Sequence, residues 1–82
     1  MLSKDKELEI INDRFYRCEK FGFKDKFQSA WENTKMYNGK KFKVIERVPL
    51  ELCWLAGEEP LWKVEIDGKV FDAYPTEIIN GL

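Results

Sequence analysis

The stretch Leu61–Ile79, which reads LWKVEIDGKVFDAYPTEII, decides the fold of this chain. Two runs of β-branched and aromatic residues flank Asp67-Gly68, and this pair suits a two-residue type I′ turn because Asp and Gly tolerate positive φ. The sequence therefore predicts an antiparallel hairpin whose register is set by the turn. The expected pairs are Trp62 with Ala73, Lys63 with Asp72, Val64 with Phe71, Glu65 with Val70, and Ile66 with Lys69.

This register separates an apolar face of the hairpin from a charged face. We expect the apolar face in the core and a cross-strand ion pair between Lys63 and Asp72 on the other face. Pro75 cannot continue the sheet, so the residues after it predict a single helical or 3₁₀ turn that buries Ile78 and Ile79. The predicted core side chains of the two strands are Trp62, Val64, Ile66, Phe71 and Ala73.

Length and composition indicate one small domain. The 82 residues are 44% hydrophobic, which is enough for a globular core although 35% of them are charged. We expect a single domain over 1–82, with a helical part over 1–37 and an antiparallel β part over 40–79. The net charge of −1 selects neither nucleic acid nor an anionic membrane.

A first helix is predicted over about residues 4–20. Ser3 is the expected N-cap, and Gly22 is the expected stop signal. Four apolar residues fall in one stripe at helical spacing and are expected to face the core, namely Leu8, Ile11, Phe15 and Cys18.

A second helix is predicted over about residues 26–36. Asp25 is its expected N-cap, and Gln28 three residues later completes a pattern similar to a capping box. Because the connection through Gly22 is short, the two helices are expected to form a helical hairpin or to lie together across a sheet. The apolar face predicted for the second helix holds Phe27, Ala30, Trp31, Thr34 and Tyr37.

The remaining segments predict strands. Residues 41–48 are β-branched and apolar, and the consecutive Val44 and Ile45 indicate a bulge or burial on both sides. Leu50–Leu55 alternates in part and is interpreted as a short strand. The fold class is therefore α+β: an N-terminal helical hairpin packed on a small antiparallel sheet or on an SH3-like partial barrel of three to four strands.

The segments NGKKFKVIERV and PLWKVEIDGKVFDAYPTEII resemble small uncharacterised proteins of Gram-positive bacteria and their phages. The resemblance covers about the last half of the chain. It implies an SH3-like β-module, carried on a mobile element, and it supplies no catalytic residues.

Residue chemistry argues against an enzyme. The chain has no histidine, and therefore lacks both the usual general base near neutral pH and the commonest metal ligand. Cys18 and Cys53 cannot form a four-ligand zinc site, and they are interpreted as reduced core thiols. We expect no catalytic residue, no cofactor and no metal. Charges replace the apolar run of an export signal, so a soluble cytoplasmic protein without a membrane partner is expected.

Two candidate surfaces for a protein partner remain. A stripe on the first helix, Ile10, Arg14, Arg17 and Phe21, has the mixed composition of an interface, although Ile10 and Phe21 could instead cover the hairpin. The second surface lies beside the acidic pair Glu58-Glu59 and is either an exposed patch or a core strand. Its members are Leu52, Trp54 and Leu55.

A third surface has the composition of a nucleic-acid groove. Lys40, Lys41 and Lys43 lie close in sequence to Tyr37 and Phe42, which is typical of single-strand binding, although a solvated strand end also explains the lysines. Together with Arg14 and Arg17 they form the set expected to contact phosphates.

The first functional hypothesis is a non-enzymatic protein-interaction module, for example a phage or mobile-element accessory protein that binds and inhibits a host protein complex. The alternative is a small nucleic-acid-binding accessory or regulatory factor with weak affinity. An unpaired strand edge also leaves a homo-oligomer open.

Overall fold

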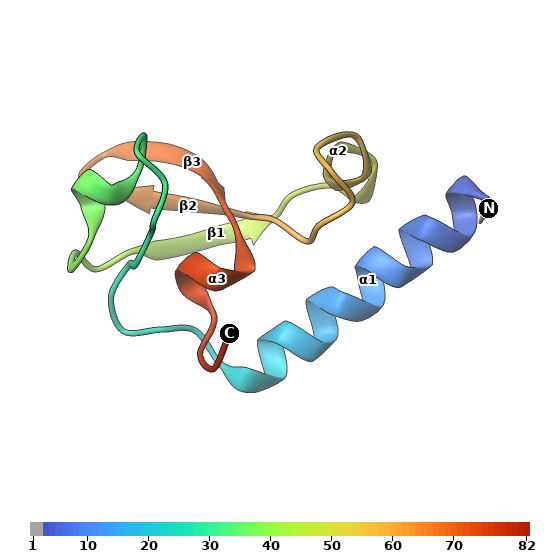
Figure 1. Cartoon of the computed structure of the whole chain (residues 1–82), viewed down its shortest axis with the longest axis horizontal. Helices are drawn as coiled ribbons and strands as arrows, with labels where there is room; N and C mark the ends of the chain where they lie inside the picture. The colour runs from blue at the N-terminus through green and yellow to red at the C-terminus, as the bar shows by residue number, and fades with distance from the viewer. Residues whose placement is uncertain (1–2) are drawn as a thin grey trace.

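The computed structural model describes residues 3–82, and over these residues the chain has an α+β fold (Figure 1). The predicted α+β class is confirmed, and so is a small antiparallel sheet, which is open and has the strand order β1-β2-β3. The first two residues of the predicted domain lie outside the described residues. The elements are α1 (Lys4–Phe21), η1 (Lys35–Tyr37), β1 (Lys43–Arg47), α2 (Leu50–Leu55), β2 (Trp62–Ile66), β3 (Lys69–Ala73) and α3 (Pro75–Ile78).

The β2-β3 hairpin has the predicted register at all five pairs. Asp67 and Gly68 have φ angles of 52° and 78°, which are the positive values that a type I′ turn requires. The predicted apolar face is buried, with Phe71 half-buried. The predicted ion pair is wrong: Lys63 is opposite Asp72 in the register, but its Nζ lies 4.0 Å from Glu46 Oε1 on the other neighbouring strand.

The predicted bulge is present in β1. Val44 pairs with Val64 and Glu46 pairs with Lys63, so the residue between them has no partner on β2. Ile45 is that extra residue, and its side chain is exposed. The bulge therefore explains an apolar residue on the outside of the sheet.

Helix α1 contacts the sheet at one end of β1 and β2 and supplies one side of the core. Ser3 Oγ accepts a hydrogen bond from the Lys6 amide, and Gly22 ends the helix with a φ of 83°, as predicted. The Phe15 ring meets the Trp62 ring edge to face, with centroids 4.9 Å apart. The core comprises Ile11, Phe15, Cys18, Phe27, Val48, Cys53, Leu61, Trp62, Val64, Ile66, Ala73, Ile78 and Ile79.

The second helix of the predicted hairpin does not form. Over 26–34 the structure has irregular backbone and turns, and the single 3₁₀ turn η1 follows. The backbone here bonds to distant parts of the chain: the Lys24 amide donates to the Ile78 carbonyl, and the Gln28 amide donates to the Glu77 carbonyl. These tertiary bonds replace the helical ones, so only Phe27 of the predicted apolar face is fully buried.

The segment predicted as a strand over Leu50–Leu55 is helix α2. Pro49 directly precedes it, and the Pro49 carbonyl accepts hydrogen bonds from the amides of Leu52 and Cys53. Leu and Glu are good helix formers, and the alternation of apolar residues is too short to distinguish a strand from a helix.

Both cysteines are free and buried, as expected, although Cys53 lies on a helix rather than a strand. Burial raises the pKa of the Cys18 and Cys53 thiols above the ordinary value. Within residues 3–82, no helix has the length and apolar character needed to cross a bilayer.

Candidate interaction surfaces

Helix α2 is held against the first turns of α1 by contacts among four side chains. Trp54 Nε1 donates a hydrogen bond of 2.6 Å to Glu7 Oε2. Lys4 Nζ lies 5.0 Å from the centre of the Trp54 ring and 3.0 Å from Glu51 Oε2. Trp54 is thus half-buried and joins two helices, which is a position that the sequence could not assign.

The same helix exposes two leucines. Cys53 faces the core, while Leu50 and Trp54 are half-buried, so helical geometry turns Leu52 and Leu55 outward. Leu52 is 54% exposed and Leu55 is 70% exposed. The alternative in which this segment fills the core as a strand is therefore wrong for both leucines.

An acidic loop continues from α2 and is bound by α1. Arg14 donates a hydrogen bond of 3.4 Å to the Glu58 carbonyl and lies 3.7 Å from Glu59 Oε1. The negative charge of Glu7 raises the pKa of the Glu58 carboxyl above its ordinary value. A hollow of about 190 Å³ lies between the helix and this loop, lined by Glu7, Ile10, Arg14 and Glu58.

The predicted stripe on α1 is divided by these contacts. Ile10 and Arg14 lie at the hollow beside Glu58, whereas Arg17 is paired with Asp13 at 3.8 Å and Phe21 is the last residue of the helix. Ile10 and Phe21 are both exposed. The alternative that they cover a helical hairpin fails because the second helix is absent.

We define the α2 end as residues 4–14 together with 50–60. It contains seven acidic residues and three basic ones. Five of the seven predicted protein-binding residues belong to it, namely Ile10, Arg14, Leu52, Trp54 and Leu55. Arg17 and Phe21 lie further along α1, outside this end.

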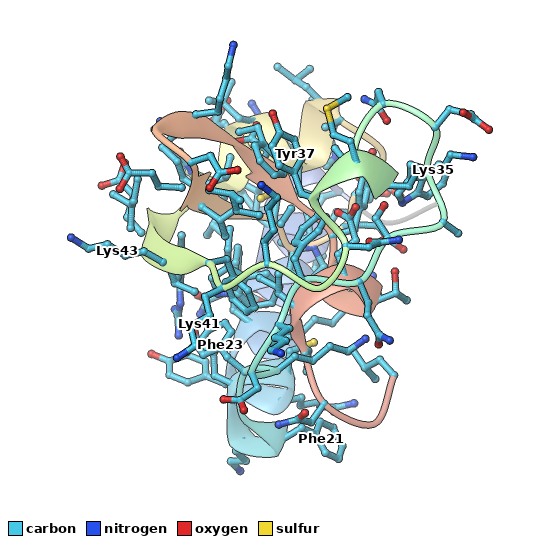
Figure 2. The ribbon with its side chains drawn as sticks, turned by 90° about the vertical axis from the view of Figure 1, so that its left-hand side faces the viewer. Phe21, Phe23, Lys35, Tyr37, Lys41 and Lys43 are labelled. Carbon is cyan, nitrogen blue, oxygen red and sulfur yellow. The ribbon has the colours of Figure 1, made fainter. Side chains whose placement is uncertain are left out.

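The five residues predicted to bind nucleic acid do not share one surface. Arg14 contacts the loop that precedes β2, whereas Lys40 forms an ion pair with Asp67, which follows β2. The two contacts therefore lie at opposite ends of the central strand. Lys41 and Lys43 are exposed near the Lys40 end, on the side of the molecule shown in Figure 2.

The sequence prediction missed the residues that hold α2 in place. Lys4 and Glu7 were not singled out, because their roles depend on a helix that was predicted as a strand. It also missed Glu77, whose buried carboxylate accepts hydrogen bonds from Thr34 Oγ1 and the Tyr74 amide. The order Pro75-Thr76-Glu77 at a helix start is a signal that could have identified it.

In the part of the chain that the structure describes, no three His, Cys, Asp or Glu side chains are grouped so as to hold a metal ion. No family model, curated protein or solved structure matches the chain.

Proposed function

We propose that the chain is a non-enzymatic interaction module that binds a partner protein through the α2 end. The observation that supports this most directly is Leu55, a large apolar side chain that is 70% exposed on a helix fastened in place. Leu52 extends the same outer face, and Ile10 of α1 is also exposed. Exposed apolar side chains that lie together mark protein interaction sites, and a few residues near the centre of an interface carry most of its binding free energy.

The charges around these residues favour a positively charged partner. Glu51, Glu58 and Glu59 are exposed or half-buried at this end, and acidic residues outnumber basic ones there. A partner that fits has an apolar pocket for Leu52 and Leu55, bordered by lysine or arginine. Opposite charges at the rim favour fast association and correct orientation.

The fastening of α2 also favours binding. A six-residue helix is not stable by itself, and ordering it on association would reduce the affinity. In this chain the bond from Trp54 to Glu7 and the ion pair of Lys4 with Glu51 order the helix before any partner arrives. The two leucines are therefore presented in one arrangement.

Binding at this end changes the activity of the partner by covering part of its surface. A standard interface buries about 800 Å² on each partner, which is about one seventh of the 5575 Å² surface of this chain. The sequence resemblance implies a mobile-element context, and in that context we propose an accessory protein that inhibits a host protein complex in this way.

The test compares two glutamate substitutions of equally exposed apolar residues. Leu55→Glu lies on α2, and Met36→Glu, at a side chain that is 66% exposed, lies on η1 outside the α2 end. Tagged wild-type and variant proteins are used to capture partners from a bacterial lysate at moderate salt, and the recovered protein is then titrated in purified form.

We expect Leu55→Glu to weaken the purified complex by about thirtyfold or more, as for a central interface residue, and Met36→Glu to leave the affinity unchanged. Circular dichroism and urea unfolding confirm that both variants are folded. Failure to recover any partner, or equal weakening by the two substitutions, contradicts the proposal.

A further inference from the structure

The small net charge hides a strong separation of charge along the chain. Residues 20–43, which we call the lysine end, contain seven of the fourteen basic residues but two of the fifteen acidic residues, Asp25 and Glu32. The rest of the chain is correspondingly acidic. A local positive field therefore exists that the total of −1 does not reveal.

Backbone hydrogen bonds bring the two lysine-rich parts of this segment together. The Phe27 amide donates to the Lys40 carbonyl at 2.8 Å, and the Gly39 amide donates to the Phe27 carbonyl at 2.9 Å. Residues 24–28 consequently run beside residues 38–41. The lysines of KFGFKDK (20–26) and KKFK (40–43) thus belong to one end of the molecule.

Most of these lysines keep an unneutralised charge. Lys35 is paired with Glu32, and Lys40 is paired with Asp67. Lys24 Nζ is held by neutral acceptors, 2.9 Å from the Thr76 carbonyl and 3.3 Å from Gln28 Oε1. The ion pairs found over 3–82 include no contact of Lys20, Lys26, Lys41 or Lys43.

Exposed aromatic rings accompany the lysines. Phe21, Phe23 and Trp31 are 60%, 38% and 52% exposed. Figure 2 shows Phe21 and Phe23 on the same side of the molecule as Lys41 and Lys43. The Trp31 ring packs against the Tyr74 ring, with centroids 5.5 Å apart. All three rings are exposed to solvent within the lysine-rich segment.

Two adjoining hollows lie beside Lys24 in the same segment. They measure about 450 and 400 Å³ and share Lys24, Gln28 and Asn38. The first is also lined by Lys26, and the second is also lined by Trp31. Because both are open to solvent and lie side by side, they form a path over the surface rather than an enclosed ligand cavity.

We infer that the lysine end binds single-stranded nucleic acid. Unpaired lysines attract the phosphates, and exposed rings stack on bases, which are available only in an unpaired strand. This site differs from the set of phosphate-binding residues predicted from the sequence, because Arg14 and Arg17 lie outside it. The residues that take their place are Lys24, Lys26, Phe21 and Trp31. It is separate from the α2 end, so one proposal does not depend on the other.

The test measures the binding of labelled oligothymidylate and oligouridylate of about 12 nucleotides, and of a duplex of the same length, at several salt concentrations. Four phosphate contacts predict a slope of about −3 for the logarithm of affinity against the logarithm of salt. The double variant Lys41→Gln/Lys43→Gln should reduce this slope by about 1.4, because each lost contact removes about 0.7. The charge-matched control Lys6→Gln/Lys63→Gln, outside the lysine end, should leave the slope unchanged.

A second variant tests stacking separately from charge. Phe21 is exposed at the end of α1, so Phe21→Ala should keep the fold and weaken single-strand binding by about tenfold. The oligonucleotide should quench the fluorescence of the exposed Trp31, and this quenching should be lost in Trp31→Phe. That result supports contact at the second hollow. The inference is overturned by undetectable binding at about 50 mM salt, by equal losses in the two lysine pairs, or by duplex binding that is as strong as single-strand binding.

Discussion

Helix α2 is held to the molecule by side chains, whereas the lysine end is held by backbone hydrogen bonds. At the α2 end, Trp54 and Lys4 contact acidic side chains on the neighbouring helix. At the lysine end, the amides of Lys24, Phe27 and Gln28 donate to carbonyls that are distant in sequence. The first arrangement depends on a few partly exposed side chains, and the second depends on backbone bonds together with the buried Phe27 ring and the Asn38 side chain.

The two surfaces should therefore differ in their tolerance to mutation. Lysines and exposed rings of the lysine end can change without breaking the backbone bonds that position them. A single change at Trp54 or Glu7 should loosen α2 and displace the leucines with it. Substitutions at both ends test this difference, and the first is the one that should reduce the free energy of unfolding most.

Phe27→Ala should destabilise the protein more than a substitution at Trp54, Asn38 or Glu19. Phe27 is fully buried, and its ring meets three other aromatic rings at centroid distances of 5.6 to 6.5 Å. Removing a core phenylalanine costs about 3 to 5 kcal/mol, against a total of about 4 to 12 kcal/mol for a domain of this size. Urea unfolding measures the loss. The three rings are those of Tyr37, Phe42 and Phe71.

The control for Phe27→Ala is Trp31→Ala in the same segment. Trp31 is exposed, so its removal should cost less than about 1 kcal/mol. Equal losses for the two variants would mean that Phe27 does not fix this segment to the core.

Trp54→Phe should loosen α2 while the sheet stays intact. The substitution keeps an aromatic ring but removes the donor that bonds Glu7, and a bond to a charged group at a half-exposed site is worth about 1 to 2 kcal/mol. Hydrogen exchange should show faster exchange at the α2 amides and unchanged exchange in β2. Glu7→Gln retains an acceptor and should have the smaller effect; the reverse order would contradict the role of the indole donor.

The parts of the fold that the sequence predicts correctly depend on neighbouring residues. The hairpin register follows from Asp67-Gly68, and the limits of α1 follow from Ser3 and Gly22, because turns and caps are decided within a few residues. The bulge at Ile45 is visible in the same way, as an interruption of alternation.

The two wrong elements have tertiary causes. Asp25 and Gln28 form a plausible helix start, but the Gln28 amide bonds to Glu77, which is 49 positions later in the chain. The segment at Leu52 alternates like a strand, but it packs on a helix that begins at Lys4. Both Glu77 and the helix at Lys4 lie far from these segments in the sequence, so no local pattern contains them. The exposed leucines could therefore be identified as candidates from their residue type, but their arrangement on a helix could not be predicted.

Asn38→Ala should loosen the lysine end by a smaller amount. The Asn38 side chain accepts a hydrogen bond from the Ser29 amide and donates one of 2.9 Å to the Ser29 carbonyl, so it substitutes for a missing pair of backbone bonds. Because both bonds are exposed, their loss should cost about 1 kcal/mol. Thermal unfolding measures the effect, with Asn33→Ala as the control on the same segment. If the two variants unfold alike, the Ser29 contact does not hold this loop.

The smallest expected effect is a pH dependence at Glu19, which lies between the two ends. Hydrogen bonding by Arg47 lowers the pKa of the Glu19 carboxyl, with a further contribution from the Trp62 indole, although burial opposes the shift. Because the pKa is lower in the folded state, the unfolded chain binds more protons in acid. The stabilisation is therefore complete above the ordinary pKa of about 4.3 and is lost as the pH falls through the folded value.

Glu19→Gln should remove that pH-dependent contribution. Between about pH 5 and pH 2, the unfolding free energy of the wild type should fall more than that of the variant. The side chains of Arg47 and Glu19 are 34% and 30% exposed, so screening by solvent should keep the difference below about 1 kcal/mol. Urea unfolding across this pH range measures it, and parallel curves would contradict the role of the Arg47 pair. Since Glu19 belongs to neither the α2 end nor the lysine end, the same variant should bind a protein partner and an oligonucleotide as the wild type does, and a loss of either would show that the two surfaces are coupled through α1.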